Sequence, residues 1–214
     1  MQRIWFAVLV ATLGAAGTMQ AQRQRPHAVR PPSRWVLNGH SVAALGTSVG
    51  VPGQGDDDLK TAAGLGAGIE VGYRITPRLT AYAGLDVVKQ GVDVVGLDGS
   101  FGLTHLEAGA RMSFPIRGSK AMPYLGGWIG RRSLSSTVEN FNTGQQVALS
   151  LSGLAAGASG GVQVFVSPVL ALDGGLSVGV GKMGNVKVDG QGVEAPSFNN
   201  TTTTRVRVGA SWYP

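Results

Sequence analysis

The clearest pattern in this sequence is a one-by-one alternation of apolar and polar or small residues over positions 65–87. Odd-numbered residues are apolar in 65–73, and the residues between them are glycine or glutamate. The alternation resumes over 79–87, after the connection 75–78. A period of two is that of a β-strand, and Pro77 favours a tight turn, so the stretch predicts an antiparallel hairpin.

The length of the hairpin arms and the character of their two faces indicate a membrane. Each arm is about ten residues long, which is enough for a tilted strand to cross a bilayer. One face is apolar, and the other carries glycine and scattered charge, which is typical of the wall of a transmembrane β-barrel. A soluble sandwich or lipocalin-like barrel is the alternative, but its exposed face would carry more charge and less glycine.

Similar alternation recurs along the chain and predicts eight strands whose connections are alternately long and short. This rhythm is typical of outer-membrane barrels, with short turns on the periplasmic side and both termini there. The sequence therefore predicts an all-β, eight-stranded antiparallel up-and-down transmembrane β-barrel over residues 35–214, with the inward faces of the first and fifth strands left open. The expected strands are 35–49, 62–74, 79–89, 103–114, 123–132, 148–166, 169–181 and 202–213.

The residues before the first strand predict export. Residues 1–21 begin with Arg3 and continue as a short apolar run, which indicates a secretory signal peptide cleaved after Gly17 or after Ala21. An N-terminal membrane anchor is the alternative. Residues 22–34 hold three prolines among arginines and predict a basic, extended periplasmic linker.

Composition and charge narrow the functional classes. The 214 residues include 34 glycines and no cysteine, so a narrow barrel is favoured and disulfides or thiol nucleophiles are excluded. Most of the net charge of +6 lies before the barrel, because five of the 18 basic residues precede position 35. The remaining 13 basic residues are nearly balanced by 12 acidic ones. The barrel region is therefore close to neutral, and nucleic-acid binding is not indicated.

The inward-facing positions hold equal numbers of carboxylates and arginines. Side chains fill the lumen of an eight-stranded barrel, and a buried charge without a partner costs several kcal/mol. We therefore predict a paired network that plugs and rigidifies the barrel, with a narrow ion path as the alternative. The network is expected to comprise Glu70, Arg74, Asp86, Glu107, Arg111, Asp173, Arg205 and Arg207.

Aromatic residues gather where strands meet the short turns. Such residues form a girdle at the membrane interface of barrels, and core filling is the alternative interpretation. The predicted girdle comprises Trp35, Tyr73, Phe114, Trp212 and Tyr213.

Candidate catalytic and metal-binding residues are few. His105 and Glu107 share a strand face, but the pattern places no serine beside them, and His40 and Ser41 point to opposite faces. The acidic run 56–58 lacks the spacing of a calcium loop. The sequence therefore predicts no enzyme, no metal site and no cofactor.

Three segments resemble a known family. Residues 71–79 form a strand–turn–strand, residues 122–127 read Met-Pro-Tyr-Leu-Gly-Gly, and residues 207–214 read Arg-Val-Gly-Ala-Ser-Trp-Tyr-Pro. These resemble the small eight-stranded outer-membrane barrels of Gram-negative bacteria, the OmpA/OmpX-like superfamily, over residues 35–214.

The resemblance implies a location in the outer membrane and assembly by the barrel assembly machinery. Gly209 and Trp212 match the glycine and first aromatic of the terminal strand signal, whereas Pro214 stands where the family usually ends in Phe or Trp. The expected partners are outer-membrane lipid, lipopolysaccharide and an unknown ligand of the surface loops, with the chain a monomer. We predict a structural or interaction role; the alternatives are a small ion or solute channel and an envelope enzyme acting on lipid.

Overall fold

The computed structural model describes residues 33–49, 59–92, 100–139, 146–188, 191–193 and 198–214. The predicted signal peptide, most of the predicted linker and the acidic run 56–58 lie outside the described residues. No helix in these segments has the length and apolar character required to span a bilayer.

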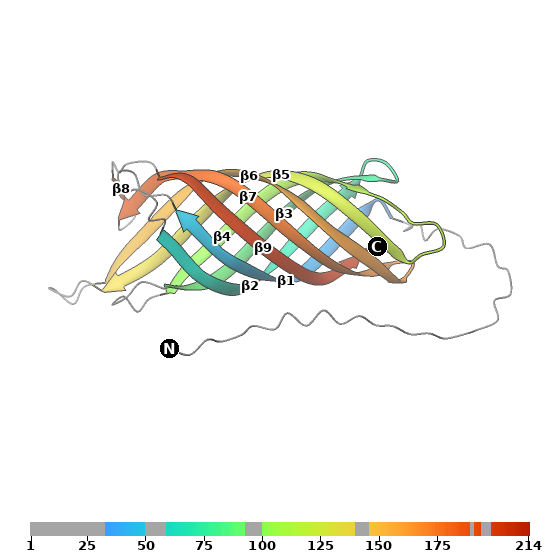
Figure 1. The fold of residues 1–214 in the computed structure, drawn as a ribbon, viewed down its shortest axis with the longest axis horizontal. Coiled ribbons are helices and arrows are strands. Elements are labelled where there is room, and N and C mark those ends of the chain that lie inside the picture. The colour runs from blue at the N-terminus through green and yellow to red at the C-terminus, as the bar shows by residue number, and fades with distance from the viewer. Residues whose placement is uncertain (1–32, 50–58, 93–99, 140–145, 189–190, 194–197) are drawn as a thin grey trace.

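Within the described segments, nine strands form one antiparallel sheet that closes on itself (Figure 1). Neighbours in the wall follow the order β6-β5-β4-β3-β2-β1-β9-β7, and pairing of β6 with β7 closes the barrel. The three-residue β8 pairs with β7 outside this circuit, so the prediction of an eight-stranded antiparallel barrel is confirmed. The strands are β1 Trp35–Val49, β2 Leu59–Arg74, β3 Leu79–Val92, β4 Ser100–Ser113, β5 Ala121–Glu139, β6 Gln146–Ser167, β7 Leu170–Val188, β8 Gln191–Val193 and β9 Phe198–Trp212.

The strands run further toward the long connections than the sequence pattern predicts. The expected loops 133–147 and 182–201 are wrong in part, because β5 continues to Glu139, β6 starts at Gln146 and β7 continues to Val188. These extensions are rich in serine, threonine and asparagine, which blur the apolar alternation. Their backbones still pair with neighbouring strands, since ladder hydrogen bonds do not depend on side-chain polarity.

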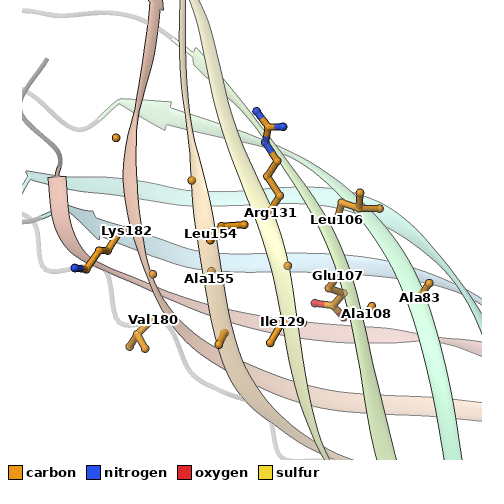
Figure 2. Close-up of a pocket in the computed structure, with 15 residues that line it drawn as sticks. Ala83, Leu106, Glu107, Ala108, Ile129, Arg131, Leu154, Ala155, Val180 and Lys182 are labelled. Atoms are coloured by element: carbon orange, nitrogen blue, oxygen red, sulfur yellow. The ribbon is translucent and has the colours of Figure 1, made fainter. Parts of the chain in front are cut away.

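The two faces of the wall have opposite character, and the outer one is apolar. Ile69 and Leu154 point outward with 63 % and 75 % of their surface exposed, whereas Asp86 and Arg205 point inward and are 1 % exposed. This inverts the arrangement of a soluble barrel and suits a wall surrounded by lipid. Across β4 to β7 the outer face is hollowed into a groove lined mainly by apolar side chains (Figure 2).

The faces that the sequence left open are fixed by the barrel. On β1, Val36 and His40 point inward, and on β5, Tyr124, Trp128 and Arg132 do so. The three β5 residues follow one another at a spacing of four, which keeps them on one face of a strand. All three are large, and their presence inside determines how the lumen is filled.

Candidate functional site

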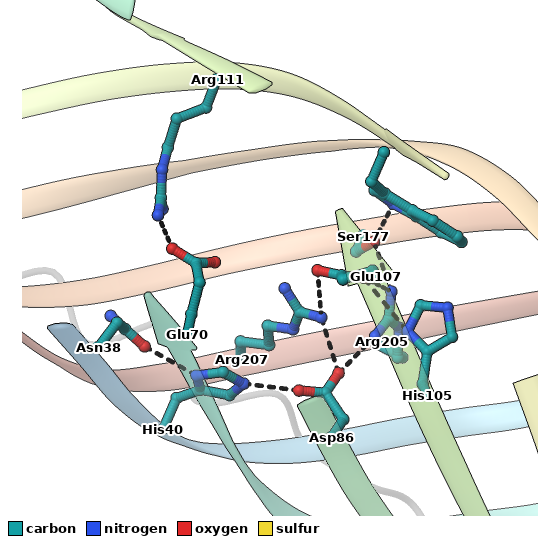
Figure 3. A network of polar contacts seen from close by, with 11 residues as sticks. Asn38, His40, Glu70, Asp86, His105, Glu107, Arg111, Ser177, Arg205 and Arg207 are labelled. Atoms are coloured by element: carbon teal, nitrogen blue, oxygen red, sulfur yellow. Dashed lines mark hydrogen bonds and ion pairs between the residues drawn. The ribbon is translucent and has the colours of Figure 1, made fainter. Parts of the chain in front are cut away.

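Two carboxylates and two arginines form the centre of the lumen (Figure 3). Arg207 Nη2 donates hydrogen bonds to Asp86 Oδ2 at 2.7 Å and to Glu107 Oε1 at 2.8 Å. Arg205 donates to Glu107 Oε2 at 2.7 Å and also contacts Asp86 Oδ2. Because the arginines lie on β9 and the carboxylates on β3 and β4, these contacts tie opposite parts of the wall together.

Two histidines extend this centre. His40 on β1 lies 2.8 Å from Asp86 Oδ1 through Nε2 and 2.7 Å from Asn38 Oδ1 through Nδ1. His105 Nδ1 lies 3.2 Å from Glu107 Oε2, and its ring packs edge-on against Trp128 with centroids 4.8 Å apart. Each carboxylate of the centre therefore contacts two arginines and one histidine.

A second group of charges lies closer to the short turns. Arg111 forms an ion pair with Glu70, and its Nη1 is 4.0 Å from Asp173 Oδ2. The same guanidinium lies over the rings of Tyr82 and Tyr124, 5.0 Å and 5.3 Å from their centroids. Tyr124 in turn donates a hydrogen bond to Asp173 Oδ1 at 2.9 Å. Stacking on two aromatic faces stabilises a cation that has been removed from water.

Two clusters of buried apolar side chains lie on either side of the charged groups along the barrel. A cavity of about 20 Å³ remains between the charged groups, lined by Glu70, Arg111 and Arg207 among others. That volume holds about one water molecule. The cluster at the turn end is Val36, Phe165, Ala171 and Tyr213, and the cluster toward the loop end is Val42, Ala44, Val88 and Leu103.

Glycines on neighbouring strands make room for Trp128. A Cβ atom at Gly157 would lie 2.5 Å from Trp128 Cζ2, and one at Gly179 would overlap the same ring. The indole fits there because these two positions have no side chain, and its Nε1 donates to Ser177 Oγ at 2.9 Å. The abundant glycine therefore allows bulky side chains to occupy the lumen.

The structure brings seven of the eight residues of the predicted charge network into these two groups. The contacts are not one-to-one, because Arg205 and Arg207 share the same two carboxylates. Arg74 points into the same interior, but it lies at the turn end and is half-buried. Its backbone N–H donates a hydrogen bond to Arg34 O at 2.7 Å.

Comparisons with known proteins agree with this architecture. No protein-family model and no curated protein matches the chain. Among solved structures, Neisserial surface protein A aligns with a TM-score of 0.61 at 20 % identity, covering 85 % of this chain and 98 % of that one. The outer membrane protein OprG from Pseudomonas aeruginosa aligns at 0.55, with 13 % identity and coverage of 84 % and 95 %.

A third solved structure, the attachment invasion locus protein Ail of Yersinia pestis, aligns with a TM-score of 0.52 at 15 % identity, covering 84 % of this chain and 98 % of Ail. This chain has the fold of the small outer-membrane β-barrels. At these identities the likeness concerns the arrangement of strands, so the side chains of the lumen must be interpreted on their own contacts.

Several residues in the lumen of this outer-membrane-type barrel were missed by the sequence analysis. Arg132 is 2 % exposed, lies over the Trp128 ring at 5.6 Å, and donates from Nη1 to Thr201 O at 3.5 Å. The spacing of Tyr124, Trp128 and Arg132 is a signal that could have revealed this face. Asn38 and His40 on β1 also enter the lumen, as do Tyr82, Gln163 and Ser177 from faces that the alternation had already set opposite the apolar outer residues.

The aromatic residues near the short turns divide between the two faces of the barrel. Trp35 and Tyr73 point outward and pack edge-on with centroids 5.0 Å apart, and Phe114 and Trp212 are also exposed. The assignment of Tyr213 to the girdle is wrong. Tyr213 follows the outward Trp212 and therefore points inward; it is 3 % exposed and donates to Gln163 Oε1 at 2.8 Å.

The candidate catalytic residues have structural contacts. His40 contacts Asn38 and Asp86 inside the lumen, whereas Ser41 is exposed on the opposite face of β1. His105 and Glu107 belong to the charged centre, enclosed in the lumen. Over the described segments, no group of three or more histidine, aspartate or glutamate residues is arranged to hold a metal ion.

Proposed function

We propose that this protein is an integral outer-membrane barrel with a closed lumen, whose work is to anchor and present its long connections at the cell surface. The observation that supports this most is the charged centre, where Arg205 and Arg207 each contact Asp86 and Glu107 across the interior. A conducting path needs connected water, and here paired side chains and apolar clusters occupy that space. Catalysis is not part of this proposal.

The names of two structural neighbours support an interaction role. One is called a surface protein and another an attachment invasion locus protein, and a further structure of the latter contains the heparin analogue sucrose octasulfate. These names and this ligand belong to those proteins. For this chain they favour a monomeric barrel whose partner meets the long connections, with lipid and lipopolysaccharide around the wall.

Assembly by the barrel assembly machinery is part of the same proposal. Gly209 and Trp212 lie on β9, which pairs with both β1 and β7 and so completes the wall. Trp212 is 49 % exposed on the outside, where an assembly factor can reach it. Replacing Trp212 by alanine is expected to lower the yield of inserted barrel in cells while leaving refolding in detergent intact.

The experiment that tests the closed lumen is single-channel recording on the refolded barrel in a planar bilayer, after a heat-shift gel has confirmed folding. The protein is expected to give no unitary steps above background. Val208→Ala, on the outer face of the same strand as Arg207, is the matched control for protein insertion. Reproducible currents that change with Arg111→Ala or Glu70→Ala would instead establish the channel function.

A further inference from the structure

A groove of about 930 Å³ crosses the lipid-facing wall over β4 to β7 (Figure 2). Its floor contains Ala108 and Ala156, and its sides include Ile129, Leu154 and Val180. These three larger side chains have 60–75 % of their surface exposed. Small residues between large ones leave an apolar hollow in the wall that can accept an acyl chain.

Two cations border this groove in one row of the sheet. Arg131 on β5 is the pairing partner of Leu154 on β6, which is the pairing partner of Lys182 on β7. Both cations point outward, and Figure 2 shows them on opposite sides of Leu154. Strands two apart in a sheet are separated by about 10 Å, so two long basic side chains can converge on one anionic group.

The charge of these cations is not neutralised within the row. The fourth member of the row is Leu106 on β4, and Arg131 Nη2 donates to the neutral Ser152 Oγ at 3.0 Å. Elsewhere in the protein, Arg205 and Arg207 contact carboxylates directly. The outer pair therefore presents positive charge beside an apolar surface, which matches an amphiphile with an anionic head.

The row lies at the loop-side edge of the apolar band. Below it on β5 the outward residues are Leu125 and Ile129, and above it they are Ser133 and Ser135. Basic side chains at the end of an apolar band extend to the headgroup level of the bilayer. Because short turns mark the periplasmic side, this edge faces the outer leaflet.

We infer that this groove binds a phosphorylated lipid of the outer leaflet, of the lipid A type. An acyl chain occupies the hollow over Ala108 and Ala156, and a phosphate is held between Arg131 and Lys182. The inference rests on the proposed outer-membrane location. A purely zwitterionic lipid would fill the hollow equally well but would leave the two cations without an anionic partner.

The test uses the refolded full chain in phosphatidylcholine nanodiscs that contain a small fraction of bisphosphorylated lipid A. Native mass spectrometry measures the lipid A retained, with dephosphorylated lipid A of the same acyl composition in parallel. The wild type is expected to retain the phosphorylated form preferentially. The double variant Arg131→Gln, Lys182→Gln is expected to lose that preference and to bind about thirtyfold more weakly, since each basic residue near anionic lipid contributes about fivefold.

Two further variants separate charge from shape. Arg78→Gln with Arg117→Gln removes two exposed cations from the short turns at the opposite end, and retention is expected to stay at the wild-type level. Ala156→Leu fills the floor of the groove and is expected to reduce retention of both lipids while the cations remain.

Equal retention of the two lipids by the wild type, or unchanged retention by the double variant, would overturn the inference. A heat-shift gel on every sample distinguishes this outcome from a failure of the proposed function. A chain that folds and inserts without preferring phosphate contradicts only the lipid site, whereas one that does not insert contradicts the outer-membrane barrel itself.

Discussion

Arg131 and Arg132 are adjacent in the sequence and lie in opposite environments. Arg132 is 2 % exposed in the lumen and packs over Trp128, whereas Arg131 points outward to the lipid-facing groove. A single step along a strand reverses the face, so the same residue type is enclosed by protein in one case and borders lipid in the other. The inward side chains are stabilised by contacts with particular partner residues. The outward side chains need only a polarity that matches their depth in the bilayer.

The largest expected difference between the two faces concerns the charged centre. Replacing Glu107 by alanine leaves Arg205 and Arg207 with Asp86 as their shared carboxylate, and loss of one member of a buried ion pair costs about 3–5 kcal/mol. Urea unfolding of the refolded barrel, followed by tryptophan fluorescence, should show a fall of this size in the free energy of unfolding.

Val208→Ala is the outer-face control for that experiment. Val208 directly follows Arg207 on β9 and is 65 % exposed, and its replacement is expected to change the free energy of unfolding by less than about 1 kcal/mol. If Glu107→Ala were as mild as Val208→Ala, the charged centre would not stabilise the barrel.

A smaller effect is expected where the lumen is filled by shape. Gly179→Ala places a methyl group on the Trp128 ring, and such overpacking costs about 1–3 kcal/mol. The cost should largely disappear in a Trp128→Ala background, which a double-mutant cycle of unfolding free energies would measure.

The matched outer substitution is Gly39→Ala, because a Cβ atom at Gly39 would meet no other atom within 4 Å. It is expected to leave stability essentially unchanged. Equal penalties at Gly39 and Gly179 would mean that both glycines act through backbone conformation and not through the space they leave.

The smallest expected effect concerns a single hydroxyl group. Tyr213→Phe removes the hydrogen bond to Gln163 in the lumen, which should cost about 1 kcal/mol. The same substitution on the outer face, Tyr73→Phe, removes only a 3.4 Å contact with the exposed Arg34 and should cost less. Thermal unfolding monitored by heat-shift gels can compare the destabilisation caused by the two substitutions. A larger effect of Tyr73→Phe would indicate that Tyr213 belongs to the interface girdle after all.

The barrel was predictable from the sequence because its faces follow a strict period of two. In the segments that alternate cleanly, such as β2 and β3, the inward carboxylates could be identified before the partners were known. On β5, glycines interrupt the apolar positions, so the pattern did not assign Trp128 and Arg132 to the lumen. The contacts of Arg205 and Arg207 with β3 and β4 were beyond prediction, because the closure of the wall determines which residues meet across the interior.

The strands differ in length, so the rim of the barrel is not level. Strands β5, β6 and β7 span 19, 22 and 19 residues, whereas β3 and β4 span 14 each (Figure 1). At the loop end, β5 continues four residues beyond Ser135, its last pairing partner with β4, and at about 3.3 Å per residue and a tilt near 40° this raises that side of the rim by roughly 10 Å. A large partner approaching along the cell surface would meet the long strands β5 to β7 first, so the wall itself favours one direction of contact.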